Sequence, residues 1–244
     1  MSKLPFCLFI SDLHLTPERP TPVRLFERFI AEVAPGAQAL YILGDFFEAW
    51  VGDDTLDQPF NRTICATLKS LASSGVEVYF MPGNRDFLAG PTFATAAGVT
   101  LLADPVEVIL HGTPTLLAHG DQYCTDDADY QSFRRQVRDP DWQRQFLAQP
   151  LPQRLALAAS LRERSEHAKA GKRPEIMDVN PARIEAVLES HAVQRIIHGH
   201  THRPARHELQ SDGRICERWV LPDWYETGGY LTCDTSGCRL SSFP

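Results

Sequence analysis

Side chains that bind metal ions recur along the chain, each placed directly after a short apolar run. They comprise two carboxylates, one amide and four imidazoles: Asp12, Asp45, Asn84, His14, His119, His200 and His202. Together these ligand types suit Mn, Fe or Zn better than a site for Mg²⁺ alone, and the set contains no cysteine, which argues against a structural zinc. The residue types therefore predict a metal site assembled from separate segments of the chain.

Each of these pieces is weak evidence when taken alone, because Gly-Asp pairs and single histidines are common in turns and helix caps. Five pieces in order, each at the end of an apolar run, are strong evidence together. Independent turns would also leave unexplained why five of the nine histidines gather there, namely His14, His119, His198, His200 and His202. His198 occupies no ligand position in the pattern, and we expect it to pack beside a ligand or to support one.

The apolar runs before these residues are predicted to be buried strands, because they are short and bounded by glycine and proline. They cover residues 6–10, 39–43, 76–81, 115–118 and 195–197. Helical spacing at 23–33, 60–71 and 181–190 predicts helices layered on a sheet. The ligands should converge at the carboxyl ends of the strands, where glycine beside four of them lets the backbone turn sharply. Residues 205–240 alternate and predict antiparallel hairpins, with a turn at 211–213.

Residues 128–173 differ from the rest and are predicted to form a helical cap inserted into a single domain of residues 1–244. This segment holds ten basic and five acidic residues, and Pro140, Pro150 and Pro152 divide it into short helices. Its excess positive charge, placed opposite the metals, suits a polyanionic substrate. Its apolar residues either line a groove for acyl chains or pack the cap onto the body, and the composition leaves both alternatives open.

The motifs resemble those of the calcineurin-like metallophosphoesterase family. They are D-x-H at 12–14, G-D at 44–45, G-N-R-D at 83–86, the single His119, and G-H-x-H at 199–202. The resemblance covers about residues 5–205. It implies an α/β fold, a four-layer α/β/β/α sandwich of two mixed sheets.

The same resemblance implies a two-metal centre. Its first metal would be held by Asp12, His14, Asp45 and His202. Its second would be held by Asp45, Asn84, His119 and His200, so that Asp45 bridges the two. Two cations about 3.5–4 Å apart acidify a shared water and clamp the phosphoryl oxygens during in-line attack, which agrees with hydrolysis of a phosphate ester or anhydride.

Arg85 narrows the chemistry, because many relatives carry histidine at this position after the motif asparagine. Arginine cannot donate a proton near neutral pH, whereas it suits the stabilisation of charge in a transition state. A leaving group that is itself a phosphate needs no proton. Arg85 therefore favours cleavage of a diphosphate over an alkyl phosphoester, unless it serves only as a structural partner of Asp86.

A finer resemblance, over nearly the whole chain, is to the UDP-2,3-diacylglucosamine pyrophosphatases of lipid A biosynthesis. It rests on the segments 11–15, 43–48, 83–87, 119–121, 124–127, 176–180 and 198–204. It implies that water, activated by two Mn²⁺ ions, attacks the α-phosphorus of UDP-2,3-diacylglucosamine. The products would be UMP and 2,3-diacylglucosamine 1-phosphate. The enzyme would act as a peripheral protein at the cytoplasmic face of the inner membrane.

The substrate contacts that this resemblance implies are Asn84, Arg85, Asp127, Ser165, Lys169, Lys172 and His200. Lys169 is the loosest match, and a solvated helix face is the alternative for Ser165 and Lys172. Three other functions stay open: another phosphoesterase of the superfamily acting on a nucleotide or phosphoprotein, a metal-binding scaffold without catalysis, and a membrane-binding module.

Composition sets the remaining expectations. The 244-residue chain has a formal net charge of −7, which argues against a nucleic-acid partner. Its six cysteines form no CxxC pair and are expected to be buried free thiols, without a disulfide framework. The apolar stretch at 4–10 is too short for a membrane span and lacks a cleavage site, so we expect a cytoplasmic protein.

Overall fold

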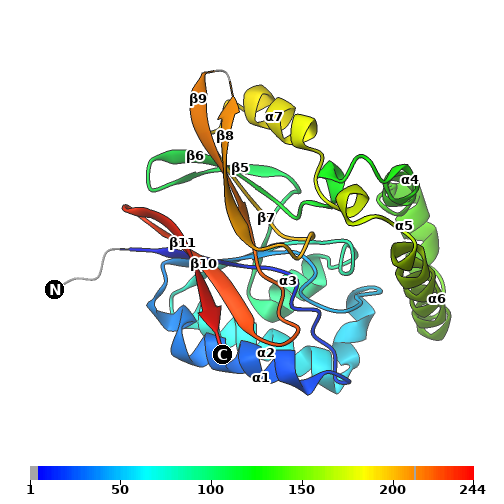
Figure 1. Cartoon of the computed structure of the whole chain (residues 1–244). Coiled ribbons are helices and arrows are strands. Elements are labelled where there is room, and N and C mark those ends of the chain that lie inside the picture. The colour runs from blue at the N-terminus through cyan, green and yellow to red at the C-terminus, as the bar shows by residue number, and fades with distance from the viewer. Residues whose placement is uncertain (1–4, 212) are drawn as a thin grey trace.

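Two mixed sheets lie face to face, and helices cover the outer side of each (Figure 1). The computed structural model describes residues 5–211 and 213–244, without the side chains of residues 166, 168–170 and 174. The first sheet has the order β11-β10-β1-β2-β3-β4, and the second has the order β5-β6-β7-β9-β8. The four-layer α/β/β/α sandwich expected from the sequence is therefore confirmed.

The first sheet consists of β1 (Cys7–Ile10), β2 (Ala39–Leu43), β3 (Glu77–Met81), β4 (Thr100–Leu101), β10 (Gly228–Asp234) and β11 (Gly237–Phe243). The second consists of β5 (Val106–Leu110), β6 (Thr113–Ala118), β7 (Arg195–His198), β8 (Ala205–Ser211) and β9 (Arg214–Val220). Helices α1 (Pro20–Glu32), α2 (Pro59–Ser73) and α3 (Pro91–Ala97) cover the first sheet, while α7 (Pro181–Ser190) covers the second. Between the sixth and seventh strands the chain forms α4 (Ala128–Val137), α5 (Pro140–Leu147) and α6 (Leu151–Ala170).

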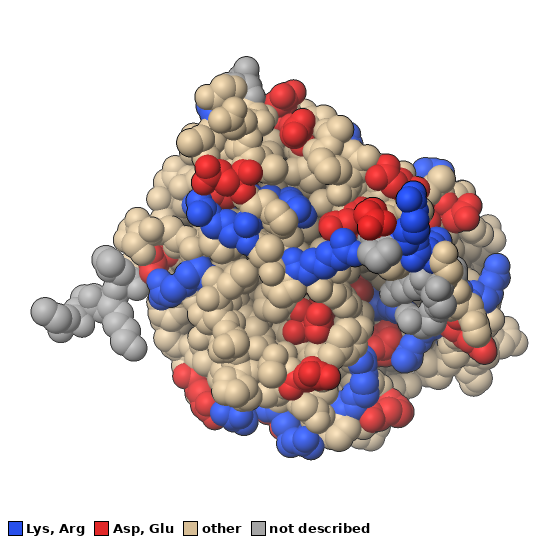
Figure 2. Space-filling view, viewed as in Figure 1, with Lys and Arg blue, Asp and Glu red and all other residues tan. Residues whose placement is uncertain are grey.

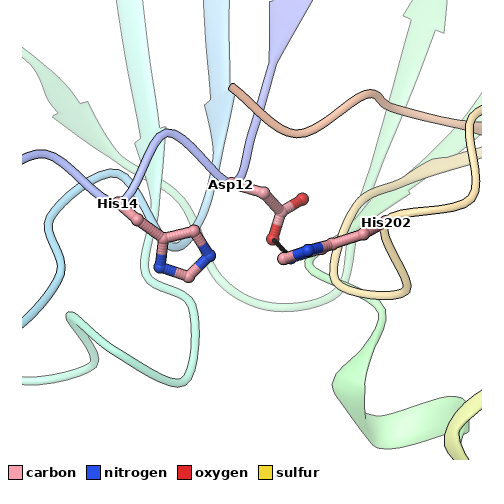
Figure 3. A group of neighbouring side chains, drawn as sticks. All are labelled: Asp12, His14 and His202. Atoms are coloured by element: carbon pink, nitrogen blue, oxygen red, sulfur yellow. Dashed lines mark ion pairs between the residues drawn. The ribbon is translucent and has the colours of Figure 1, made fainter. Parts of the chain in front are cut away.

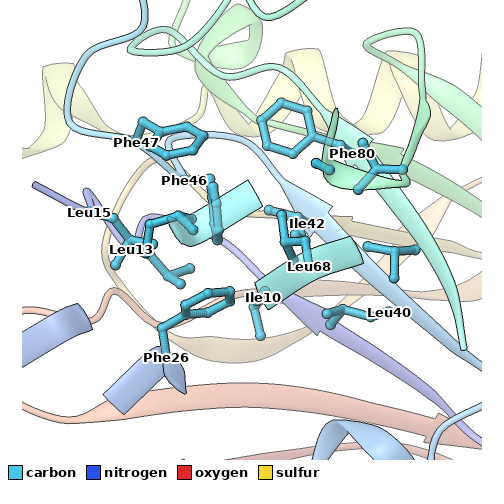
Figure 4. Packing of buried hydrophobic residues seen from close by; sticks show 14 of the residues in the cluster. Ile10, Leu13, Leu15, Phe26, Leu40, Ile42, Phe46, Phe47, Leu68 and Phe80 are labelled. Carbon is cyan, nitrogen blue, oxygen red and sulfur yellow. The ribbon is translucent and has the colours of Figure 1, made fainter. Parts of the chain in front are cut away.

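Three apolar layers hold the sandwich together. The largest lies between the first sheet and its helices, where Phe26, Phe46 and Phe80 are fully buried (Figure 4). A second layer fills the space between the sheets, and a third lies under α7. Strands β1 and β2 are buried along their whole length, which is typical of parallel strands covered on both faces.

The strand register brings the chemically important turns to one edge. Strand β1 pairs with β2 in parallel, with Ile10 opposite Ile42, and β2 pairs with β3, with Leu43 opposite Met81. In the second sheet Ala118 lies opposite His198. Because these strands end level with one another, the residues that follow them meet at the same edge of the sandwich.

The expected element boundaries hold to within a few residues. Strand β2 and helix α7 match the expected ranges, while α1 and α2 begin earlier, at Pro20 and Pro59. Proline fits the first turn of a helix because its missing N–H would have no partner there. The hairpin of β8 and β9 is present, with Ser211 opposite Arg214, but Asp212 of the predicted turn lies outside the described residues.

The expectation of six free thiols is wrong for two of them. Cys233 and Cys238 form a disulfide, while Cys7, Cys65, Cys124 and Cys216 are free and buried. The tight hairpin between β10 and β11 pairs Asp234 with Gly237, which places the two cysteines directly opposite each other with Cα atoms 4.2 Å apart. Among the described residues, no helix has both the length and the apolar character needed to cross a bilayer.

Candidate metal centre

Six of the predicted ligands gather into two groups at this edge of the sandwich. The first group is Asp12, His14 and His202, and the second is Asp45, His119 and His200. Within each group the side chains offer ligand atoms that lie within 4.8 Å of one another. Figure 3 shows the first group converging from the turn after β1 and from the loop after β7. Segments nearly 190 residues apart in sequence are thus joined at one point.

The backbone at this edge has an uncommon conformation. Five ligands have positive φ angles, namely Asp12 (57°), His14 (49°), Asp45 (50°), His200 (69°) and His202 (54°). Non-glycine residues rarely adopt this region, although aspartate and histidine tolerate it better than most. The ligands thus share the sharp turns with neighbouring glycines, since Gly44 (88°) and Gly120 (118°) also have positive φ angles, as expected. Gly199 has a different role and provides room, because a Cβ atom there would collide with Ser11 and Asp12.

In the first group, several buried polar atoms have no hydrogen-bond partner. Asp12 accepts hydrogen bonds at Oδ2 from the Ser11 hydroxyl (2.6 Å) and from the His200 amide (2.9 Å). Its other oxygen faces His202 Nε2 at 3.4 Å. That oxygen and both ring nitrogens of His14 are buried without a hydrogen bond. Since such orphaned atoms are costly in a folded protein, these residues fit a bound cation.

In the second group, His119 is held so that one nitrogen faces its neighbours. Its Nδ1 lies 2.9 Å from the carbonyl oxygen of Leu43, so Nδ1 donates a proton there. Its Nε2 lies 3.0 Å from Asn84 Oδ1 and 3.5 Å from Asp45 Oδ1. The other oxygen of Asp45 lies 3.8 Å from His14 Nε2, so this carboxylate faces both groups. This is the placement that a bridging ligand requires.

Electrostatics make the centre attractive to cations. Burial opposes a charge on His119, but the carboxylates of Asp45 and Asp121 raise its pKa to about 9. Burial and the charge of His119 lower the pKa of His200 to about 4. For Asp12, burial would raise the pKa, yet the neighbouring imidazole of His202 lowers it. Asp12 thus stays ionised, and the field that favours a proton on His119 also favours a metal ion.

Asp86 organises the turns that carry the ligands. Its carboxylate accepts hydrogen bonds from the amides of Gly83 (2.7 Å), Phe46 (2.8 Å) and Phe47 (3.2 Å). Burial raises the pKa of Asp86 to about 6. Asp86 therefore ties the turn after β2 to the turn after β3, which is a different role from the pairing with Arg85 that we considered. The amide of Arg85 donates to Asp45 Oδ1 at 2.8 Å.

Helix α4 contributes residues that the sequence analysis did not single out. The ring of Tyr130 stacks on His200, with centroids 5.8 Å apart, and its hydroxyl donates to Asp121 at 2.9 Å. Arg134 donates to the same carboxylate oxygen at 2.8 Å. Tyr130, Arg134 and Arg138 are spaced four residues apart, which places their side chains on one face of the helix. This spacing is the sequence signal by which they could have been found. This face rests on the second group.

Part of the basic charge of residues 128–173 is directed at the body, and the expectation that the rest faces a substrate stays a prediction. Arg138 donates to the carbonyl of Gly83 (3.0 Å), and Arg162 pairs with Glu48 (3.2 Å). Arg154 is buried and donates to Asp54 at 3.0 Å. Positive and negative side chains alternate over the face seen in Figure 2 and do not separate into two regions. The partners of these arginines could not be predicted from composition, because composition gives the charge of a side chain but not where it points.

The other predicted substrate residues fall into three cases. Asp127 and Lys172 contact each other, with Nζ 2.6 and 2.7 Å from the two carboxylate oxygens, so Lys172 is not on a freely solvated helix face. Asp127 also caps α4 by accepting the amide of Tyr130 at 3.1 Å. Ser165 is half-buried on α6, and the side chain of Lys169 lies outside the described residues. His198, which is not one of the predicted substrate contacts, is fully buried, with Nδ1 2.8 Å from the carbonyl of Gly199.

Comparison with known proteins identifies close relatives. Residues 7–204 match the family described as calcineurin-like phosphoesterase. A protein of Stenotrophomonas maltophilia (strain K279a), named UDP-2,3-diacylglucosamine hydrolase, is 52% identical over 242 residues, which span 96% of this chain and 97% of the relative. Proteins of the same name from Xanthomonas campestris pv. campestris (strain ATCC 33913) and Cellvibrio japonicus are each 50% identical. They cover 96% and 97% of this chain, and 97% and 98% of their own lengths.

Proposed function

Since the chain belongs to the calcineurin-like phosphoesterase family, we propose that it hydrolyses the diphosphate bond of UDP-2,3-diacylglucosamine. The products are UMP and 2,3-diacylglucosamine 1-phosphate. The observation that carries this proposal is identity of 50–52%, over 96% or more of the chain, to hydrolases named for this substrate. The names of these relatives indicate a hydrolase of lipid A biosynthesis.

Two Mn²⁺ ions are the metals that we propose for the centre. Asp12, His14, Asp45 and His202 would hold one, and Asp45, Asn84, His119 and His200 would hold the other. When bound, such a pair supplies an acidified water and neutralises charge on the phosphoryl oxygens. The mixed set of imidazoles, carboxylates and an amide supports Mn²⁺ over Mg²⁺.

Arg85 would act on the attacked phosphate. Its backbone amide donates to Asp45, and its carbonyl accepts a hydrogen bond from the amide of Trp50 at 3.0 Å. The backbone of Arg85 is therefore held on both sides of its Cα atom, beside the centre. A guanidinium there offsets negative charge as it builds on the phosphate oxygens. The leaving sugar 1-phosphate needs no proton, so arginine serves where an acid would otherwise be required.

We propose that residues of the cap and of the turns around the metal centre contact the lipid-linked nucleotide. They are Asn84, Arg85, Asp127, Ser165, Lys169, Lys172 and His200. Phe87, Trp142 and Phe146 form an aromatic cluster, with ring centroids 6.3 Å apart between Phe87 and Trp142 and 5.0 Å apart between Trp142 and Phe146. Apolar side chains exposed nearby on α4, α5 and α6 are Phe133, Leu147, Leu155 and Leu157. We propose that they receive acyl chains while the enzyme rests on the cytoplasmic face of the inner membrane.

The test is hydrolysis of UDP-2,3-diacylglucosamine in ¹⁸O-labelled water by the Mn²⁺-loaded protein. We expect both named products, with the label in UMP, because attack is proposed at the α-phosphorus. Label only in the sugar phosphate would contradict the position of attack. Failure to cleave this substrate, together with rapid cleavage of a dinucleoside polyphosphate, would contradict the proposed substrate.

A matched pair of variants tests the role of Arg85. Arg85→Ala should lower turnover by roughly 10²–10³-fold, as expected for loss of one well-placed oxyanion donor. Arg85→His should not restore it, although histidine can supply a proton. Restoration by histidine would indicate that proton donation to the leaving group is the missing function.

A further inference from the structure

Glu48 is a buried carboxylate beside the first group whose role nothing above assigns. It follows β2 by five residues and is only 7% exposed. Its amide donates to the carbonyl of Leu15 at 3.0 Å, which fixes it against the turn that carries His14. A buried carboxylate is unfavourable unless charged or polar partners surround it, so its partners indicate what it does.

One partner of Glu48 is the ligand His14. Glu48 Oε2 lies 3.7 Å from Nδ1 of this ring, while Nε2 on the other side lies 3.8 Å from Asp45 Oδ2. A histidine can offer a cation only the nitrogen that carries no proton, and a carboxylate behind the ring commonly decides which nitrogen that is. A carboxylate facing Nδ1 favours the proton there. The Nε2 lone pair is then directed towards Asp45 and the space between the two groups.

The other partners of Glu48 are two arginines from distant segments. Arg19, just before α1, forms an ion pair with Oε2 and also donates to the carbonyl of His14 at 2.9 Å. Arg162, on helix α6 of the cap, places Nε 3.2 Å from Oε1. The side chain of Arg162 is half exposed, so it can leave when α6 moves, whereas Arg19 is held by a second bond to the body.

We propose that Glu48 is a positioning residue that couples the docking of the cap to the metal affinity of the His14 group. One of its oxygens orients the ligand, and the other receives the cap helix. When α6 is docked, Arg162 fixes the carboxylate that fixes His14. Because such coupling is reciprocal, metal at the first group must also stabilise the docked cap. This inference rests on the metal centre proposed above, but not on the identity of the substrate.

The first test measures Mn²⁺ binding to the metal-free full chain by calorimetry, without substrate. Wild type should bind two ions. Glu48→Gln keeps the shape but removes the charge, and should weaken one ion by about 10- to 100-fold, the usual effect of a residue behind a ligand. The control Glu32→Gln removes an exposed carboxylate that also pairs with an arginine, Arg28, and should bind like wild type. Two unchanged affinities in Glu48→Gln would overturn the proposal.

The second test uses Arg162, whose replacement leaves the buried carboxylate in place and so avoids misfolding around it. Mn²⁺ should slow hydrogen exchange of residues 151–165 in wild type, and this protection should disappear in both Glu48→Gln and Arg162→Ala. Arg162→Lys should recover part of it. Protection by metal that persists in Arg162→Ala would contradict the coupling. Absence of Mn²⁺ binding in wild type would instead contradict the proposed metal centre itself.

Discussion

The α/β body and the cap of residues 128–173 are held in place by different interactions. In the body, large side chains such as Trp50, Phe80 and Phe93 are almost fully buried in one continuous cluster. In the cap, the buried residues among those described are Val137, Phe146 and Arg154, and one of these three is an arginine. Apolar burial contributes about 25 cal/mol per Å², whereas partly exposed ion pairs contribute roughly 0–1 kcal/mol each. Phe146 belongs to the same apolar cluster as the core of the body, so the cap has fewer buried apolar contacts than the body, not none. We therefore expect the cap to open more readily than the body.

The largest expected effect concerns the body, where the ligands are fixed. Asp45→Asn should lower turnover by about 10³-fold or more, beyond the roughly 10²-fold that loss of a supporting residue costs. The thermal midpoint should stay close to wild type, because asparagine has the same shape. Steady-state kinetics and metal analysis check this, with the exposed Asp57→Asn as control. Near-wild-type turnover with two metals bound would remove Asp45 from its bridging role.

The next effect concerns the strongest polar anchor of the cap. Arg154→Ala should weaken docking by about 1–3 kcal/mol, because Asp54 and the carbonyls of Val51 and Gln149 lose a charged donor. Proteolysis within 128–173 should then be faster, while the body stays folded. Arg144→Ala, in which both side chains of the lost ion pair are largely exposed, is the matched control and should change little. Equal proteolysis of the two variants would show that apolar contacts hold the cap.

Hydrogen exchange compares the two regions directly in the wild-type protein. Amides of α4–α6 should exchange at least about tenfold faster than those of β2 and β6, because the cap opens in a separate step. Bound substrate should slow exchange in the cap and leave the strands unchanged. Cap amides that exchange as slowly as the strands, with and without substrate, would make the cap part of the rigid body.

The smallest expected effect is a pH dependence of cap docking. The hydrogen bond from Arg154 holds the pKa of Asp54 below its ordinary value of 3.8. The stabilisation is therefore present above pH 3.8 and is lost as the pH falls through the lower pKa of the folded state. The emission of Trp142, isolated by comparison with Trp142→Phe, should report loosening in this range. Arg154→Ala should show no such step, and an identical step in that variant would assign it to another carboxylate.

Sequence patterns predicted the body well because its strands, helices and ligand turns are determined by residues close together in the sequence. Strand β2 and helix α7 fall at the expected residues, and the ligand turns follow the strands as expected. The short helix α3 was missed because seven residues give too little periodicity. The sequence also did not show where the arginine side chains point. It shows that Arg134, Arg138 and Arg154 are basic, but not that they face the body. The Cys233–Cys238 pair depends on a turn type that the residues between them do not specify.

The positive φ angles of five ligands have a consequence for how such a centre is lost. At each of these positions glycine would relax the backbone, and a left-handed conformation costs an ordinary residue roughly 1–2 kcal/mol. A change from ligand to glycine would therefore abolish metal binding while it relieves the strain of the backbone turn. At Asp12 and Asp45 this relief is offset, because the amides of His200 and Arg85 would lose the carboxylates that accept their hydrogen bonds.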